Sequence, residues 1–452
     1  MTIENYTEDE FGEKLATVIN PATPIKSIEH LKGRNDFLVE IKRTLFSAGR
    51  HVFIFGDRGV GKSSLAATAA AQYQSSDAEP ISVGGAVDET FTSIIANIAL
   101  QALKRRKYES VKVQNSVSME WRGLKWSSGD EVSGLDLASQ IKTVGDAAEL
   151  LKQVAEKHSE KPVVVLDEFD AIPDSKERSR FASLLKQLGD QSINIKFLIT
   201  GVGQSCEELL GAHASAHRQI ATIELPRLGW DARREIVTEA AEAFGLDVDN
   251  DVNWRIALIS DGFPYYIHLI MQQILWQVFT DEEPCTMVTW DHFYAGLNAA
   301  IRQTNVELKR PYEKAVLHRS NEFEDVVWST ADGDELLRPL DEMYASFSRV
   351  VTKREGRQSL VQQKYNEAIR KLKTPAYGGV LSQVPGRKGW YMYREKMLRG
   401  YVRMQAEVNK VDLTGEKKSP KSVMHVGNSR TGHYGPSVPR NIRLSREEDD
   451  GN

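Results

Sequence analysis

The sequence has few cysteines and no long apolar run. Its 452 residues include two cysteines, Cys206 and Cys285, too few for a disulfide framework or for a zinc site without other ligands. No apolar stretch approaches the ~18–20 residues that a membrane-spanning helix needs. The first residues, MTIENYTEDEF, are acidic and polar, unlike a secretory signal. We therefore expect a cytoplasmic protein with reduced cysteines and no membrane partner.

A large excess of one charge is also lacking, because the formal net charge is −5. The charge is nevertheless unevenly placed. Residues 349–446 contain 22 Lys and Arg against 6 Asp and Glu, a net charge of +16, so that the rest of the chain carries −21. Such asymmetry is typical of a chain with a nucleic-acid or anionic partner. A solvated basic surface that only keeps the domain soluble explains it equally well.

The composition divides the chain into five segments, and no internal repeat crosses them. In the second segment, short apolar runs alternate with amphipathic helical patterns, which predicts an α/β fold with a parallel sheet covered on both faces. The expected strands are residues 51–55, 81–83, 163–166, 195–200 and 220–225. The polar stretch 110–139 interrupts this pattern and is interpreted as an insertion. The five segments are an N-terminal arm (1–24), the α/β core (25–228), a helical segment (229–301), a second small domain (302–411) and a disordered tail (412–452).

Two further patterns define the segments after the core. Residues 229–301 show only helical periodicity, over 230–244, 252–259, 264–279 and 290–301. Residues 302–411 contain more helical patterns and then GGVLSQVPGRKGWYMYR, in which two short strands flank a basic turn. Helices followed by a basic-tipped hairpin are the outline of a winged helix. From residue 412 the chain loses its apolar residues, which predicts disorder.

A glycine-rich loop follows the first expected strand. It consists of Gly56, Asp57, Arg58, Gly59, Val60, Gly61, Lys62 and Ser63, which fit the phosphate-loop pattern G-x-x-x-x-G-K-[ST]. Glycines adopt the backbone angles that let N–H groups face a phosphate, and the helix expected from Lys62 directs its positive dipole end at the same anion. Lys62 is expected to reach the β- and γ-phosphates, and Ser63 to bind Mg²⁺. The loop therefore predicts binding of ATP with Mg²⁺.

An acidic pair ends another expected strand. In PVVVLDEFD, an apolar run precedes Asp167, which is thus placed at the carboxyl end of a parallel strand, where open α/β sheets bind their ligands. Asp167 is expected to hold Mg²⁺ opposite Ser63, and Glu168 to polarise the water that attacks the γ-phosphate. A strand that simply ends in solvent would look the same. The position of Asp167 and Glu168 downstream of a phosphate loop favours the functional interpretation.

Together these motifs resemble those of the AAA+ superfamily, in particular its origin-recognition and initiator ATPases and the related STAND signalling ATPases. The resemblance rests on GDRGVGKSS and VVVLDEFD, and more weakly on LKGRNDF and on Gly262-Phe263-Pro264. It covers about residues 25–301 and implies a parallel-sheet P-loop core, a helical lid at 229–301 and a C-terminal winged helix. The lid arginine that is usual in the family is missing after Pro264, which favours the STAND side of the branch.

The resemblance also implies roles for single residues. Thr200, at a strand end, matches the sensor of the γ-phosphate. Arg218 matches an arginine finger that acts across the subunit boundary of an ATP-dependent homo- or hetero-oligomer. Arg34 would lie near the adenine, Ser64 extends the phosphate loop, and Pro264 would pack on the base or ribose. A polar strand end and a surface arginine explain Thr200 and Arg218 equally well.

Basic side chains crowd the expected hairpin and the helix after it. They are Arg387, Lys388, Arg394, Lys396, Arg399 and Arg403, with Trp390, Tyr391 and Tyr393 between them. A basic wing can straddle a phosphate backbone while a preceding helix enters the major groove, so duplex DNA is the expected partner. Its expected contacts are Arg387, Lys388, Arg394 and Lys396. Alternatively, the aromatic residues form the core of the wing, which packs on the lid or on a partner protein.

The sequence is therefore compatible with two functions. In the first, the chain is an ATPase that hydrolyses the β–γ phosphoanhydride, and its nucleotide state controls a winged-helix domain acting on DNA. In the second, it is an ATP-binding switch or scaffold for a protein partner, a signalling or phage-defence module with little DNA binding. A DNA-binding regulator with a vestigial nucleotide site is disfavoured, since Lys62, Ser63, Asp167 and Glu168 are all present.

Overall fold

The computed structural model describes residues 6–25, 27–75, 78–104, 118–121, 124–127, 134–211, 216–283 and 285–413. The expected disordered tail, from residue 414 onward, and much of the expected insertion at 110–139 lie outside these residues. The described parts of the insertion include an antiparallel pair, β3 (Ser118–Trp121) and β4 (Leu124–Ser127), and most of α5 (Gly134–Gln140).

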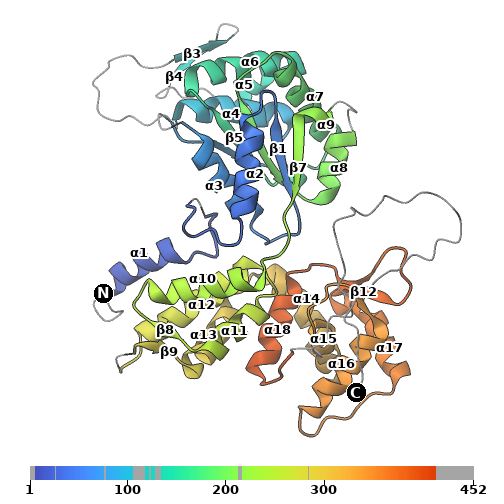
Figure 1. The fold of residues 1–452 in the computed structure, drawn as a ribbon. Coiled ribbons are helices and arrows are strands. Elements are labelled where there is room, and N and C mark those ends of the chain that lie inside the picture. Colours follow the sequence, from blue (N-terminus) through green and yellow to red (C-terminus); the bar gives the residue numbers. More distant parts are fainter. Residues whose placement is uncertain are drawn as a thin grey trace, which may run out of the picture. The chain divides into compact units, whose positions relative to one another are not determined.

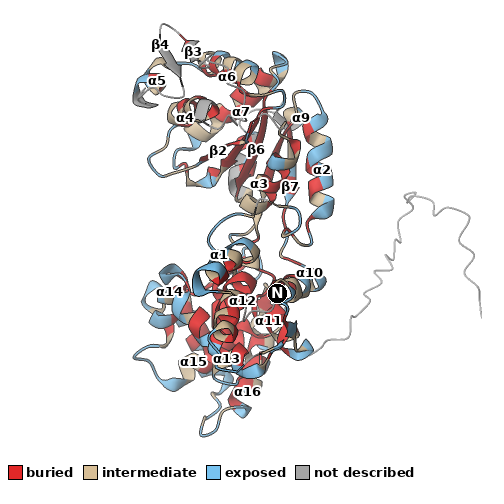
Figure 2. Cartoon of the chain, turned by 90° about the vertical axis from the view of Figure 1, so that its left-hand side faces the viewer, coloured by how far each residue is buried: buried red, intermediate tan, exposed pale blue. Residues whose placement is uncertain are grey.

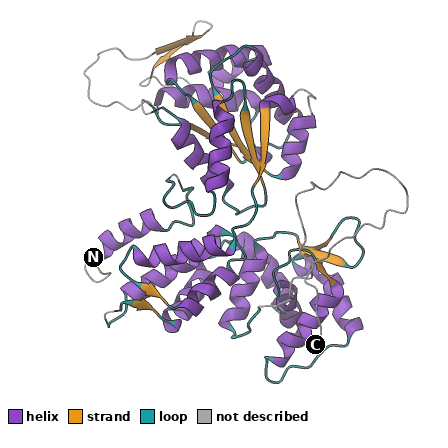
Figure 3. Ribbon diagram, in the orientation of Figure 1, coloured by secondary structure: helices purple, strands orange, loops and turns teal. Residues whose placement is uncertain are grey.

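A five-stranded parallel sheet lies at the centre of the core (Figures 1 and 3). Its strands, in spatial order, are β2 (Ile81–Gly84), β5 (Val163–Asp167), β6 (Lys196–Gly201), β1 (His51–Phe55) and β7 (Ile220–Glu224). The five strands expected from the sequence are thus confirmed. Phe55 lies opposite Gly201 of β6 and Glu224 of β7, so the chain leaves β1 at the carboxyl edge of the sheet, between β6 and β7.

Helices cover both faces of this sheet. They are α2 (Asn35–Phe46), α3 (Lys62–Tyr73), α4 (Phe91–Lys104), α6 (Val144–His158), α7 (Ser175–Asp190), α8 (Gly203–Gly211) and α9 (Ala216–Gln219). Val52 and Ile54 of β1 belong to an apolar cluster with residues of α2 and α3, whereas Phe53 belongs to a second cluster with α4, α6 and α7. Figure 2 shows the strands buried between these layers. Because both faces are covered, Val52, Phe53, Ile54 and Phe55 of β1 are all apolar.

Four helices follow the core, as expected, and the N-terminal segment adds another. The four are α10 (Trp230–Glu242), α11 (Asn250–Ile259), α12 (Pro264–Phe279) and α13 (Trp290–Gln303), with a short parallel pair of β8 (Asp247–Val248) and β9 (Met287–Val288). Residues 1–24 were expected to be a polar arm, but they contain α1 (Glu8–Val18). Phe11 of α1 is fully buried and stacks on Phe279 of α12, with ring centroids 4.3 Å apart. The spacing of Phe11, Leu15 and Ile19 gives this polar segment one apolar face.

The C-terminal part combines helices with a small sheet. Its elements are α14 (Val306–Val316), α15 (Asn321–Ala331), β10 (Arg338–Pro339), α16 (Leu340–Thr352), α17 (Gln362–Leu372), β11 (Leu381–Gln383), β12 (Trp390–Tyr393) and α18 (Leu398–Val408). The expected hairpin is confirmed, since β11 and β12 pair antiparallel. β10, which was not expected, completes a sheet in the order β10-β12-β11. None of the helices in the described ranges combines the length and apolar character required to cross a lipid bilayer.

Candidate functional site

The phosphate loop leaves β1 through three glycines with positive φ. Gly56, Gly59 and Gly61 have φ values of 155°, 79° and 96°, which other residues rarely adopt. Gly56 also has no room for a side chain, because a Cβ there would lie 2.5 Å from the Leu225 carbonyl oxygen. The backbone path of the loop therefore requires glycine at these positions.

The loop ends at the amino end of α3, where an ammonium group faces it. Gly61 is the N-cap of α3, no side chain caps the helix, and its first turn contains no acidic residue. The first N–H groups of a helix lack partners within the helix and attract anions. Lys62 Nζ donates to the Gly56 and Asp57 carbonyl oxygens at 3.1 and 2.9 Å. Burial lowers the pKa of Lys62, although the nearby carboxylates, Asp170 first, favour its charged form. This arrangement suits a phosphate chain.

Three of the expected site residues meet at the carboxyl ends of β5 and β6. Asp167 Oδ1 accepts hydrogen bonds from Ser63 Oγ, at 2.9 Å, and from Thr200 Oγ1. The Thr200 hydroxyl also accepts from the Glu168 N–H at 3.1 Å. Ser63 and Asp167 thus present a hydroxyl and a carboxylate oxygen to one place, the hard ligands that Mg²⁺ prefers. The observed contacts of Thr200 orient Asp167, and its role as a γ-phosphate sensor stays a prediction.

Glu168 has a left-handed backbone, which is unusual for a residue other than glycine. Its φ is 52°, a conformation that costs of order 1–3 kcal/mol. The fully buried Phe169 anchors the turn that follows. Gly85 permits the turn: its N–H donates to the Asp167 carbonyl oxygen at 2.7 Å, and a Cβ on Gly85 would overlap the Glu168 carbonyl oxygen. The Glu168 side chain is therefore exposed beside Asp167, as a group that acts on water must be.

Arg34 and Ser64 are held by protein contacts beside the loop. Arg34 is 3% exposed, and its Nη2 donates to the Val60 and Pro226 carbonyl oxygens at 3.0 and 2.7 Å. Burial lowers the pKa of Arg34 to about 10, so the guanidinium stays charged at neutral pH. Ser64 Oγ accepts from the Ile25 N–H at 3.1 Å. Arg34 thus supports the loop through Val60, and its contact with a nucleotide stays a prediction.

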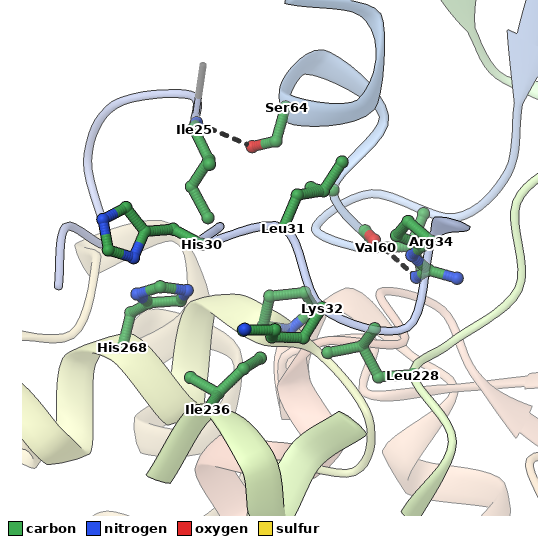
Figure 4. A pocket seen from close by; sticks show the side chains of 12 residues that line it. Ile25, His30, Leu31, Lys32, Arg34, Val60, Ser64, Leu228, Ile236 and His268 are labelled. Atoms are coloured by element: carbon green, nitrogen blue, oxygen red, sulfur yellow. Dashed lines mark hydrogen bonds between the residues drawn. The ribbon is translucent and has the colours of Figure 1, made fainter. Parts of the chain in front are cut away.

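A largely apolar pocket adjoins the loop (Figure 4). Its lining includes Ile25, Leu31, Val60, Gly61, Ser64, Ile236, Pro264 and His268. Pro264 opens α12 and faces the loop, since its Cγ lies 3.8 Å from the place that a Cβ on Gly61 would occupy. An apolar pocket with few polar groups is typical of a small-molecule site. Its position next to the phosphate loop suits the base and ribose of a nucleotide.

The two residues before α18 contact the phosphate loop, and we call Lys396 and Met397 the loop-contact pair. Lys396 Nζ lies 2.6 Å from Asp57 Oδ1, and each side chain is 32% exposed. Met397 packs so closely on Gly59 that its sulfur would overlap any Cβ there. The Met397 carbonyl oxygen accepts from Tyr266 Oη of α12 at 2.7 Å. Lys396 was expected to contact DNA, but in the structure its ammonium pairs with the loop.

Two of the six crowded basic residues are buried and do not belong to the surface of the hairpin region. Arg399 and Arg403 are 1% and 2% exposed. Both pair with Asp261, whose Oδ1 lies 2.5 Å from Arg399 Nη2 and 3.3 Å from Arg403 Nη1. Burial alone would raise the pKa of Asp261, but Arg399 and Arg403 hold it at about 2. The sequence hides this neutralisation because Asp261 is far from α18 along the chain.

The other basic residues of the hairpin face solvent. Arg387, Lys388 and Arg394 are exposed, whereas Tyr391 and Tyr393 are buried. The Arg387 guanidinium lies 5.3 Å from the centre of the Trp390 ring. The interpretation that aromatic residues form the core of the hairpin therefore holds for the two tyrosines.

Arg218 lies away from the phosphate loop of its own chain. It is exposed on α9, just before β7. Ile220, the first residue of β7, pairs with His51, the first of β1, so Arg218 is at the amino edge of the sheet. The loop follows Phe55 at the opposite edge. A catalytic role for Arg218 would therefore require a second subunit, and that role stays a prediction.

A second group of ligating side chains lies in the connection between α12 and α13 and at the start of α13. Asp281, Cys285 and His292 have ligand atoms within 4.8 Å of one another. His292 Nε2 lies 2.8 Å from Asp281 Oδ2, and its Nδ1 accepts from the Thr289 N–H at 3.2 Å. Thr289 caps α13 together with His292. Capping and the aspartate already account for both ring nitrogens.

Sequence reasoning missed Gly85 and the loop-contact pair. The Gly84-Gly85 dipeptide at the end of β2 was a usable signal for a close backbone approach. The contact of Lys396 with Asp57 had no local signal, since the two residues are 339 positions apart.

Comparison with known proteins supports an ATPase. Residues 31–199 match the family described as AAA ATPase domain, a range that contains the phosphate loop, Asp167 and Glu168. A search among curated proteins finds no significant match. The match and the five-stranded sheet confirm the expected AAA+ P-loop fold of the core. The chain therefore carries an ATP-binding AAA domain and is an ATPase.

Several solved structures resemble the chain. The Walker-type ATPase PABY2304 of Pyrococcus abyssi is 13% identical with a TM-score of 0.49, over 84% of this chain and 99% of its own. ORC2 of Aeropyrum pernix, in ADPNP–ADP complexes, is 14% identical with a TM-score of 0.46, over 87% and 98%. The RuvB Holliday junction branch migration motor of Thermotoga maritima is 14% identical with a TM-score of 0.41, over 88% and 99%. At these values the similarities carry no argument about function.

Proposed function

We propose that the chain hydrolyses MgATP in the phosphate loop and that its nucleotide state controls a C-terminal winged helix acting on DNA. In this proposal the loop N–H groups and Lys62 bind the phosphates. Ser63 and Asp167 would hold Mg²⁺, which neutralises charge on the phosphate oxygens. Glu168 accepts the proton of the attacking water. Arg218 would complete the site of a neighbouring subunit, consistent with its place at the opposite edge of the sheet.

The element order of the C-terminal part supports a winged helix. A helix (α15), a short strand (β10) and two helices (α16 and α17) precede the hairpin of β11 and β12. The basic turn of that hairpin, with Arg387 and Lys388, would be the wing. Exposed cations on such a turn can bind DNA phosphates with little dependence on sequence.

One observation carries the link between nucleotide and winged helix: the loop-contact pair. Asp57 and Gly59 belong to the loop that would bind phosphates, and they contact Lys396 and Met397 directly. The Met397 carbonyl oxygen also accepts a hydrogen bond from Tyr266 of α12, which is two residues after Pro264 of the pocket. A change in the loop or in α12 on hydrolysis would therefore act on the residues that join β12 to α18.

The test is ATP turnover by the full chain with and without duplex DNA, over a series of salt concentrations. The proposal predicts stimulation by DNA that weakens as salt rises, because binding depends on phosphate contacts. Arg387→Glu with Lys388→Glu should abolish the stimulation and leave the basal rate. The matched control reverses the charges of Lys42 and Arg43, an adjacent exposed pair on α2. This variant should still be stimulated by DNA. Turnover that ignores DNA in every variant would contradict the action on DNA.

A specific observation favours the second candidate, a switch for a protein partner. Of the six crowded cations, Arg399 and Arg403 are buried and Lys396 is paired, which leaves a smaller basic surface for DNA. Slow turnover, tightly retained nucleotide and no retention of the chain by DNA in a gel shift would support this candidate.

A further inference from the structure

One buried side chain of the pocket lacks any hydrogen-bond partner. His268 is 4% exposed, and neither Nδ1 nor Nε2 has a partner in the described structure. Buried polar groups are hydrogen-bonded in the large majority of cases, and leaving one unpaired costs about 1–3 kcal/mol. An imidazole with two unpaired nitrogens on a pocket wall therefore points to a molecule that binds there.

The two cationic side chains of the pocket lining, Lys32 and Arg34, already have partners. Arg34 donates to two carbonyl oxygens, and Lys32 pairs with Glu235 at 3.5 Å and also with Glu239. Figure 4 shows these side chains around the pocket, with His30 as the second histidine of its lining. His268 is thus the fully buried polar group of this lining that has hydrogen-bonding capacity to spare.

The position of the pocket indicates what part of a nucleotide would reach His268. Gly61 and Ser64, at the end of the phosphate loop, belong to its lining. Pro264 lies next to Gly61 and precedes His268 by four residues on α12. Ile25, Leu31 and Ile236 make the rest mostly apolar. A nucleotide whose phosphates follow the loop would extend its ribose and base into this space. Apolar side chains beside an imidazole without a hydrogen-bond partner suit the apolar faces and the polar edge of a purine.

We propose that His268 hydrogen-bonds the edge of the purine base and so fixes the bound nucleotide; this rests on the proposed function. Burial lowers the pKa of His268 to about 4, so the imidazole is neutral at pH 7 and has one donor and one acceptor. It can accept from the 6-amino group of adenine or donate to N7 of the ring. Because no group within the described ranges hydrogen-bonds either ring nitrogen, both tautomers are open to it.

Calorimetry with Mg²⁺ tests the proposal on the full chain. The probes are ATP, purine riboside triphosphate, which lacks the 6-amino group, and 7-deaza-ATP, which lacks N7. The variants are His268→Leu and His268→Asn, which have nearly the same shape and differ in hydrogen bonding. His268→Leu should weaken ATP about 3- to 10-fold, the worth of one neutral hydrogen bond, and His268→Asn should stay within about 2-fold. At least one analogue should bind the wild-type chain more weakly than ATP does, by a similar factor. The same analogue should bind His268→Leu as tightly as ATP does.

The control is His30→Leu, at the other histidine of the pocket, which should leave the analogue penalty unchanged. Unchanged ATP affinity of His268→Leu, equal losses in the Leu and Asn variants, or an analogue penalty that persists in His268→Leu would each overturn the proposal. Thermal melts without nucleotide show whether His268→Leu or His268→Asn fails to fold. If one of them does, the ATP and analogue affinities of the other variant test the proposal. If the wild-type chain binds none of the three triphosphates, the proposed function itself fails. If it binds all of them alike, only the role of His268 fails.

Discussion

Lys62 and the arginines of α18 are cations whose hydrogen-bond partners differ in charge. The Lys62 ammonium donates to two neutral carbonyl oxygens of its own loop. Arg399 and Arg403 are buried against the carboxylate of Asp261. Neutral carbonyls can be exchanged for phosphate oxygens, whereas opening a buried ion pair leaves an uncompensated charge. The first arrangement can bind a ligand, and the second joins the start of α12 to α18.

The acidic residues of the two regions show the same contrast. Glu168 and Asp261 both have a left-handed backbone, with φ of 52° and 54°. The Glu168 side chain is exposed, while Asp261 is 1% exposed and surrounded by arginines. A similar turn thus presents one carboxylate to solvent and buries the other. Surroundings, more than backbone conformation, decide which of the two can act on water.

The largest effect is expected for Glu168→Gln, which keeps the shape of the side chain but removes its basic oxygen. Turnover of ATP should fall by about 10²- to 10⁴-fold, the usual worth of a general base. Affinity for MgATP should stay within about 2-fold. Steady-state phosphate release and calorimetry measure the two quantities. Asp170→Asn, at an exposed carboxylate of the same turn, should retain activity; equal rates for Glu168→Gln and wild type would remove Glu168 from catalysis.

Asp261→Asn should destabilise the fold by about 3–5 kcal/mol, because it leaves Arg399 and Arg403 buried without a counter-charge. Asparagine tolerates the left-handed backbone, so the loss of stability results from removal of the negative charge and not from backbone strain. Urea unfolding measures it. Asp57→Asn removes the partner of Lys396, whose side chain is about one-third exposed, and should cost at most about 1 kcal/mol. Similar losses at the two positions would erase the distinction between a structural ion pair and a surface one.

The stabilisation from Asp261 should depend on pH with a defined sign. The folded-state pKa is about 2, below the ordinary value of 3.8, so the stabilisation is present above pH ~4 and is lost as the pH falls toward 2. The shift corresponds to about 2 kcal/mol. The difference in unfolding free energy between wild type and Asp261→Asn should therefore shrink by about that amount between pH 5 and pH 2. A difference that is constant over this range would show that the Asp261 pKa is not lowered.

The smallest effect is expected for the loop-contact pair. Lys396→Ala should change stability by at most about 1 kcal/mol, since both partners are about one-third exposed and such pairs are worth little. If the pair couples the loop to α18, the same variant should shift MgATP affinity by about 2- to 5-fold, which is the same free energy. Lys388→Ala is the matched control on the hairpin and should shift neither. Identical MgATP affinities of the two variants would contradict the proposed coupling between the phosphate loop and α18.

The parts of the structure that could be predicted are those with local signals. The glycine loop, the continuous apolar strands and the basic hairpin each depend on neighbouring residues. The side chains of Ser63 and Asp167 meet because parallel strands end at one edge, which follows from the strand pattern. Even α1 had a signal, the four-residue spacing from Phe11, that its polar composition obscured.

Partners distant in sequence could not be predicted. Nothing near Arg399 or Arg403 shows that Asp261 neutralises them, because that pairing depends on how α12 and α18 pack. For the same reason Lys396 was expected on DNA although it pairs with Asp57. The unpaired state of His268 is a property of the packed pocket and has no signature in the sequence around it.

Calorimetric titration of MgATP into wild type and Lys62→Ala tests the central claim most directly. The claim is that the loop binds phosphates through its N–H groups and Lys62. Two charge-assisted hydrogen bonds of about 1.5–3 kcal/mol each would be lost, so affinity should fall at least about 100-fold, while Lys388→Ala binds as wild type does. Wild-type affinity for MgATP in Lys62→Ala would contradict the account.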